Sequence, residues 1–161
     1  SYGIKKNDKA NPKMRNQIRW ENVVYQDGNC EAIARTNGKV VARHKIVTVG
    51  KAVALKAVAD NSDWKADGMD LQHIRIIAVD SKGRRVPNAV AEVKVNVVGD
   101  AQLVAMSNGN INSDELNVTD HQLLFNGSCL AILRSGVASS PVIVNISAPG
   151  LKAAKLKLAT K

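Results

Sequence analysis

The chain has 161 residues, enough for one ordinary domain or two small ones, and 45% of them are hydrophobic. Its apolar residues are mostly Val, Ala, Leu and Ile, and only 3% of residues are aromatic, a composition that suits β-sheets and argues against aromatic surfaces for stacking nucleic-acid bases or sugar rings. The net charge is +9, but no nucleic-acid motif accompanies it, so we interpret it as a solvated basic face and expect no nucleic-acid partner.

Three further sequence features limit the class of protein. No apolar run approaches the roughly 18 residues that a membrane-spanning helix needs, and no signal peptide is present, so no membrane association is expected. The chain starts at Ser1 and not at Met, from which we expect a piece of a longer protein. Cys30 and Cys129 lie far apart, and the sequence leaves open whether they are free thiols or a disulfide.

The first third of the chain predicts a few strands and a hairpin. Residues 8–17 are polar and hold Pro12, which indicates a loop, and 18–25 resemble a strand around Trp20. Residues 29–49 form the clearest hairpin, because Asn37-Gly38 suits a type I′ turn. These strands are too few to close a sandwich and leave sheet edges unpaired, so we expect residues 1–49 to be the C-terminal part of an incomplete domain.

The remainder, residues 50–161, predicts a complete immunoglobulin-like β-sandwich. About seven short strands are spaced by turn signals, which is typical of that fold, and no helix is indicated. The stretch 123–134 reads as one strand with a bend at Asn126-Gly127. The expected strands are 52–59, 71–79, 91–98, 101–106, 123–134, 142–148 and 153–159.

Residues 65–87 are the most informative segment, because two turns flank an apolar strand. Gly68 and Gly83 can supply the positive φ that tight turns need, and Asp67 and Asp80 can cap their own turns. The segment therefore indicates architecture and not catalysis.

No constellation of residues in the sequence indicates catalysis or metal binding. The histidines His44, His73 and His121 lie far apart, and no serine or cysteine has a base placed beside it by a motif. The loop 108–115 is rich in oxygen ligands but lacks the spacing of a calcium loop. We therefore predict no catalytic residue, no cofactor site and no metal site.

Two local features carry competing interpretations. Asp63, Asp67 and Asp70 crowd one turn and could hold a cation weakly, although turn capping explains them more simply. Trp64 stands at a strand entry, where an exposed ring could contact a sugar, although a tryptophan packed in the core is the favoured interpretation. Carbohydrate is therefore kept as a candidate ligand through Trp64.

The order of motifs along the chain resembles the C-terminal accessory domains of bacterial family 2 glycoside hydrolases, the β-galactosidase and β-glucuronidase type found in Bacteroidetes. In residues 50–161 the resemblance rests on Lys65-Ala66-Asp67-Gly68, Val79-Asp80, Gly83, Val86-Pro87, Val93/Val95/Val97, Asn108-Gly109, Phe125-Asn126-Gly127, Cys129-Leu130-Ala131 and Gly150-Leu151-Lys152. In residues 1–49 it rests on Trp20, Asp27-Gly28, Glu31-Ala32-Ile33-Ala34 and Gly38-Lys39-Val40-Val41-Ala42.

Two departures from the family pattern stand out. Gln26-Asp27-Gly28 replaces the usual proline-glycine turn, and Asn110 stands where an acidic residue commonly follows Asn-Gly. In the family the catalytic glutamates lie in a barrel outside this region, so the resemblance carries no catalytic residue to this chain.

The resemblance implies a non-catalytic module of a periplasmic or secreted glycosidase, with a structural, dimerisation or substrate-access role. The partners it implies are the remainder of the parent enzyme and, through the unpaired edges, a second copy of the chain. Two other classes stay open: an immunoglobulin-like adhesin or cell-surface spacer, and a carbohydrate-binding module.

Overall fold

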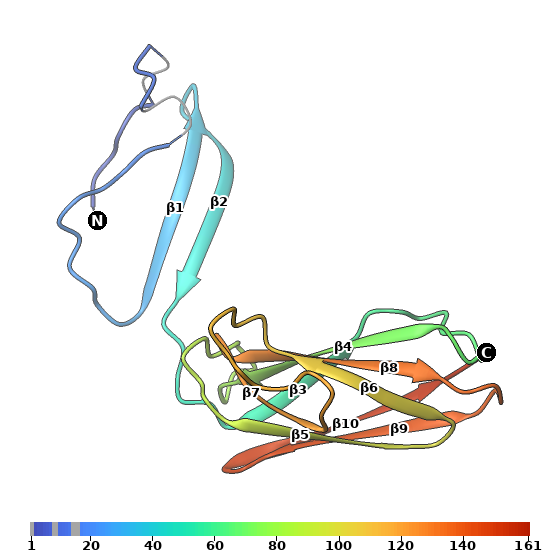
Figure 1. Ribbon diagram of the computed structural model, residues 1–161. Coiled ribbons are helices and arrows are strands. Elements are labelled where there is room, and N and C mark those ends of the chain that lie inside the picture. Colours follow the sequence, from blue (N-terminus) through green and yellow to red (C-terminus); the bar gives the residue numbers. More distant parts are fainter. Residues whose placement is uncertain (1, 8–9, 14–16) are drawn as a thin grey trace. The chain divides into compact units, whose positions relative to one another are not determined.

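The computed structural model describes residues 2–7, 10–13 and 17–161, and its regular elements are all strands (Figure 1). This confirms the all-β class. Ser1 and parts of the loop expected at 8–17 lie outside the described residues. The strands are β1 (Asn29–Thr36), β2 (Lys39–Val47), β3 (Ala54–Ala59), β4 (Leu71–Val79), β5 (Glu92–Val98), β6 (Ala101–Ser107), β7 (His121–Leu123), β8 (Ser128–Ser135), β9 (Pro141–Ala148) and β10 (Leu151–Ala159).

The chain divides into two compact units, Ser1–Thr48 and Val49–Lys161. The first unit contains the antiparallel hairpin β1–β2. Its turn residues Asn37 and Gly38 have φ of 50° and 78°, which confirms the turn that the sequence predicts. A β-bulge interrupts the register between Ala34 and Arg35.

The strand expected at 18–25 is wrong, because this segment forms no strand. It runs beside the N-terminal residues, and the contacts include side chains: Tyr2 Oη donates to the Val24 carbonyl at 3.5 Å and Lys5 Nζ to the Arg19 carbonyl at 2.6 Å. Side-chain donors do not make a ladder, since a β-strand needs a partner backbone in register. An apolar sequence pattern alone was not enough to form the element.

The second unit is a β-sandwich, as expected, with eight strands in two layers. One layer has the order β6-β8-β4-β3 and the other β10-β9-β5-β7 (Figure 1). The two meet where β3 and β10 run parallel, with Lys152 opposite Ala54. All other pairings in this unit are antiparallel.

The core lies between these layers and follows the period-two alternation of the strands. In β8 and β9 every second side chain is buried. β-Branched and small apolar residues predominate, as the composition predicts. The buried cluster is Leu55, Trp64, Ile74, Ile76, Ala78, Val93, Val95, Met106, Leu124, Cys129, Ala131, Leu133, Val142, Val144, Ile146 and Ala148.

The single strand expected at 123–134 is in fact two strands in opposite layers. β7 pairs with β5, whereas β8 pairs with β4 and β6. Asn126 and Gly127, the predicted bend, have φ of 49° and 69° and lie in the turn that crosses between the layers. A hydrophobic pattern continues through the turn because both flanking strands face the same core.

Candidate functional site

The turn before β4 contains Asp63, Asp67 and Asp70, the acidic residues that the sequence offered as a possible weak cation site. Asp67 Oδ1 accepts hydrogen bonds from the backbone N–H of Met69 at 2.9 Å and of Asp70 at 2.7 Å. These donors lower the pKa of the Asp67 carboxyl, the Met69 N–H contributing most. The two Asp70 oxygens accept from the N–H groups of Lys65 at 2.8 Å and Leu71 at 2.9 Å.

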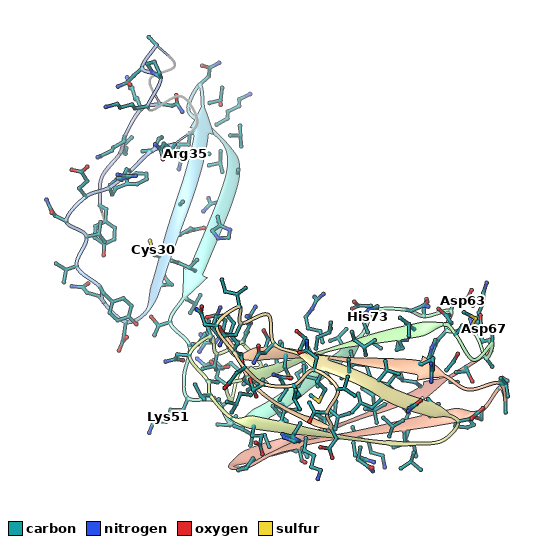
Figure 2. The ribbon with its side chains drawn as sticks, in the orientation of Figure 1. Cys30, Arg35, Lys51, Asp63, Asp67 and His73 are labelled. Atoms are coloured by element: carbon teal, nitrogen blue, oxygen red, sulfur yellow. The ribbon has the colours of Figure 1, made fainter. Side chains whose placement is uncertain are left out.

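The third acid of the turn, Asp63, is exposed and pairs with Lys161 Nζ at 3.1 Å. Figure 2 shows Asp63 and Asp67 at the end of the sandwich that holds the C-terminus. A shallow, open depression lies over this turn, and its lining residues are Asn61, Asp63, Lys65, Asp67, Met69 and Asp70. The Asp67 and Asp70 oxygens hold backbone donors of their own turn, which is the capping role that the sequence favoured.

Trp64 lies in the core beneath this turn and is only 1% exposed. Its indole Nε1–H donates to the Asp70 carbonyl at 3.0 Å, and its own carbonyl accepts from the Lys161 N–H at 2.9 Å. The ring therefore offers no open face to a sugar. The indole N–H of Trp64 thus binds the turn, and its backbone carbonyl binds the C-terminal residue.

Asp80 is the centre of the second predicted turn, after β4. Its Oδ1 accepts from the N–H groups of Lys82 at 2.9 Å and Arg84 at 3.0 Å, as predicted from the sequence. Its Oδ2 binds the Arg84 guanidinium, with Nη2 at 2.6 Å and Nε at 2.8 Å, and also accepts from the Gly50 N–H at 3.0 Å. The Arg84 hydrogen bonds, with those backbone donors, hold the pKa of Asp80 far below its usual value. Gly83 has φ of 73°, the positive value that its turn requires.

The loop between β6 and β7 is organised around Glu115. Its Oε1 accepts from the Leu123 N–H at 2.9 Å, and its Oε2 accepts from Asn108 Nδ2 at 3.0 Å and Ser113 Oγ at 2.8 Å. These donors lower the pKa of Glu115, the Leu123 N–H contributing most. The carboxylate thus closes the loop onto β7, and its oxygens are engaged by protein donors.

The histidines lie in three different strands, and none has a catalytic arrangement. His44 is in β2, His73 in β4 (labelled in Figure 2) and His121 in β7. His121 Nδ1 lies 2.8 Å from Asp120 Oδ1, which raises the pKa of His121, and 3.0 Å from Thr119 Oγ1. A nucleophile–base–acid relay needs the hydroxyl and the carboxylate on different ring nitrogens. Here both contact the same one.

Both cysteines are free, Cys30 exposed on β1 and Cys129 buried on β8. Burial raises the pKa of the Cys129 thiol to about 12. Within the described residues, no three His, Cys, Asp or Glu side chains gather as a metal site would require. No helix in that part of the chain could cross a membrane.

The sequence analysis did not identify two residues, Arg84 and Glu115, whose side chains hold a turn and a loop of the sandwich in place. Arg84 was not singled out, although its spacing of four from Asp80 across a glycine turn is a usable signal. Glu115 was counted only as part of a polar loop. Its role depends on β7, which the sequence pattern merged with the next strand.

Each part of the chain is similar to a described protein family. Residues 55–157 match the family described as glycoside hydrolase family 2 C-terminal domain 5. Residues 1–42 match a separate family described only as a domain of unknown function, DUF4982.

Individual relatives extend the match over the whole chain. The β-galactosidase BoGH2A of Bacteroides ovatus is 30% identical over 161 residues, which is 100% of this chain and 18% of that protein. A β-glucuronidase of Formosa agariphila is 28% identical over 147 residues, 89% of this chain and 15% of that protein. The chain thus spans less than a fifth of the length of either relative.

A solved structure supports the same relationship. The crystal structure of a glycosyl hydrolase family 2 member from Bacteroides cellulosilyticus superposes with a TM-score of 0.88 at 31% identity, covering 92% of this chain and 20% of that one. Sequence and fold therefore point to the same group of large enzymes.

Proposed function

The chain belongs to the family of glycoside hydrolase family 2 C-terminal domains, and on this premise we propose that it is a non-catalytic C-terminal region of a longer family 2 glycosidase. The observation that carries the proposal is the match over 55–157, joined by 30% identity along the whole chain to a β-galactosidase. The parent activity we favour is that of a β-galactosidase, with a β-glucuronidase as the other candidate.

The role proposed for the region is to stabilise the parent enzyme, to mediate its dimerisation or to shape access of substrate to its active site. The polar clusters support this, because Asp67, Asp80 and Glu115 each hold turns and loops of the sandwich itself. Such rigid turns can position loops near a neighbouring active site, as scaffolds commonly do.

We propose that the parent enzyme is periplasmic or secreted. We also propose that this region of it consists of two parts. Residues 50–161 form a complete immunoglobulin-like sandwich, supported by the two layers and their shared core. Residues 1–49 form the C-terminal part of an incomplete one, supported by a hairpin whose residues are all exposed.

The decisive experiment compares three proteins: the full-length parent, the parent lacking the region equivalent to 1–161, and the 161-residue chain alone. Each is assayed with chromogenic β-galactoside and β-glucuronide and by thermal unfolding. We expect cleavage by the parent and none by the isolated chain. The truncated parent should keep its catalytic residues but unfold at a lower temperature, or lose its oligomeric state.

Two results would overturn the proposal. Cleavage of either glycoside by the isolated chain would place catalysis in this region. An upstream sequence made of tandem copies of residues 50–161, without a glycosidase barrel, would instead establish the adhesin or spacer class.

A further inference from the structure

The dipeptide Asn-Gly occurs at three places in the chain, each in a turn or loop. Asparagine followed by glycine is the pair most prone to spontaneous deamidation, because glycine has no side chain to hinder attack by its own nitrogen on the asparagine amide. The three pairs therefore share the same chemistry, and only their surroundings in the fold differ. They are Asn37-Gly38, Asn108-Gly109 and Asn126-Gly127.

Deamidation of such a pair consumes nothing but water. The glycine nitrogen gives its proton to solvent and bonds to the asparagine Cγ, which closes a succinimide ring. The bond from Cγ to the amide nitrogen breaks, and that nitrogen takes a proton from solvent and leaves as ammonia. Water then opens the ring at either carbonyl, which leaves aspartate or isoaspartate. The ring closes only when the peptide after the asparagine rotates toward its side chain, so a rigidly held pair has to open first.

The pair Asn126-Gly127 is held rigidly by the sandwich. The Asn126 carbonyl accepts from Arg85 Nη2 at 2.6 Å and from Arg85 Nε at 3.2 Å. Gly127 is buried, its carbonyl accepts from the Ala78 N–H at 3.0 Å, and a Cβ on it would strike the Val86 carbonyl. Rotation of this peptide therefore has to break the Arg85 bonds and displace packed backbone.

The pair Asn108-Gly109 is held through the asparagine side chain. Asn108 Nδ2 donates to Glu115 Oε2 and to the Leu123 carbonyl, both at 3.0 Å. Asn108 Oδ1 accepts from the Asn110 N–H at 2.9 Å. The Cγ that would be attacked is thus fixed by three hydrogen bonds, and all of them have to break before it can turn toward the glycine nitrogen.

The pair Asn37-Gly38 stands at the tip of the hairpin β1–β2 (Figure 1). Both residues are exposed, and a Cβ on Gly38 would meet nothing within 4 Å. Arg35 Nη1 donates to the Gly38 carbonyl at 3.3 Å, a contact that involves neither the Asn37 amide nor the Gly38 nitrogen. Only the tip of the hairpin has to move for ring closure, and such exposed tips open at low cost.

We infer that Asn37 is a site of spontaneous self-modification in this protein, and that the sandwich protects Asn108 and Asn126 from the same reaction. Each event replaces a neutral amide with a carboxylate and so lowers the net charge of +9 by one. The isoaspartate product also inserts a methylene into the main chain of the turn that pairs Thr36 with Lys39. Deamidation does not depend on glycoside cleavage, so this site stands apart from the proposed function.

The test follows all three asparagines in one sample of the 161-residue chain. The folded protein is incubated at mildly alkaline pH, and samples are digested with pepsin in acid, where deamidation is slow. Peptide mass spectrometry measures the conversion of each amide to an acid, and electron-transfer fragmentation separates aspartate from isoaspartate. We expect Asn37 to convert at least about tenfold faster than Asn108 and Asn126, because the latter two require opening of the sandwich. In urea all three should convert at similar rates, since each precedes glycine.

The variant Asn37→Gly is the matched control, because Gly-Gly also suits a type I′ turn. It should lose the fast conversion, and Asn108 and Asn126 should keep their slow rates. Equal rates at the three asparagines of the folded chain would overturn the inference, as would faster conversion of Asn108 or Asn126. An Asn37 that stays intact in the folded chain for as long as the reaction takes in urea would also overturn it.

Discussion

Removing the Trp64 side chain tests the central structural role assigned to this residue. Trp64 is 1% exposed, and its Nε1–H donates to the Asp70 carbonyl, which also accepts from the Ser135 N–H. Trp→Ala substitutions in cores cost about 3–5 kcal/mol. We expect Trp64→Ala to destabilise the second unit by that amount, a shift of about 10–20 °C in its melting temperature. Trp64→Phe keeps most of the apolar contact and removes one of the two hydrogen bonds to the Asp70 carbonyl, which still accepts from the Ser135 N–H at 3.0 Å, so we expect a loss of about 0.5–1.5 kcal/mol in the free energy of unfolding.

Cys129 provides an assay specific to the second unit. In a Cys30→Ser background it is the single thiol, buried and with its pKa raised to about 12, so it labels only when the sandwich opens. Labelling across a urea series then yields the free energy of unfolding. The chain's other tryptophan supplies the matched control. Trp20 is 37% exposed in the first unit, and Trp20→Ala should change this free energy by less than about 0.5 kcal/mol.

Two outcomes would refute this reasoning about Trp64. If Trp64→Ala lowered the free energy of unfolding by less than about 1 kcal/mol, the ring would not be packed in the core as described. Retention of the unmutated chain in polysaccharide affinity gels, abolished in a folded Trp64→Ala variant, would show that the ring meets sugar and not the core.

Two further predictions concern the turns. Gly127 and Gly150 both have positive φ, but a Cβ at Gly127 would strike the backbone carbonyl of Val86 whereas one at Gly150 meets nothing within 4 Å. Urea unfolding should therefore show that the free energy of unfolding falls by about 1–2 kcal/mol in Gly150→Ala and by about 2–5 kcal/mol in Gly127→Ala. Equal losses would contradict the close approach of Gly127 to the Val86 carbonyl. The second prediction concerns pH. Because the pKa of Asp80 in the folded chain lies below its ordinary value of 3.8, ionised Asp80 stabilises the fold fully above that pH, and this contribution is lost as the pH falls further. The urea concentration at the unfolding midpoint should fall on acidification below about pH 4, and it should fall less steeply with pH in Asp80→Asn. If the midpoint depended on pH equally in both proteins, this would count against the Arg84 pairing.

Local chemistry explains which turns and strands the sequence predicted correctly. Asn37-Gly38 has the positive φ values of its hairpin turn, and Asp67 and Asp80 cap the turns that contain them. Each of these depends on residues only a few positions apart. The prediction of a strand at 18–25 was wrong, because the described residues supply no partner strand to make a ladder there.

The candidate site was predictable only as far as its contacts are local. The capping of Asp67 and Asp80 within their turns followed from the sequence. The bond from Asp80 to the Gly50 N–H, thirty residues away, did not, nor did the closure of the Glu115 loop onto Leu123. Both depend on which strands become neighbours.

By itself the sequence determined an all-β chain, its alternation of buried and exposed positions, and the places where it turns. These follow from the period of two in a strand and from the few residues that accept positive φ. Only the tertiary structure decided that 123–134 divides between two layers, that β3 lies parallel to β10, and that Trp64 is enclosed and not open to solvent. Strand partners are selected by the summed packing of residues far apart in the chain, and no short stretch of sequence contains that sum.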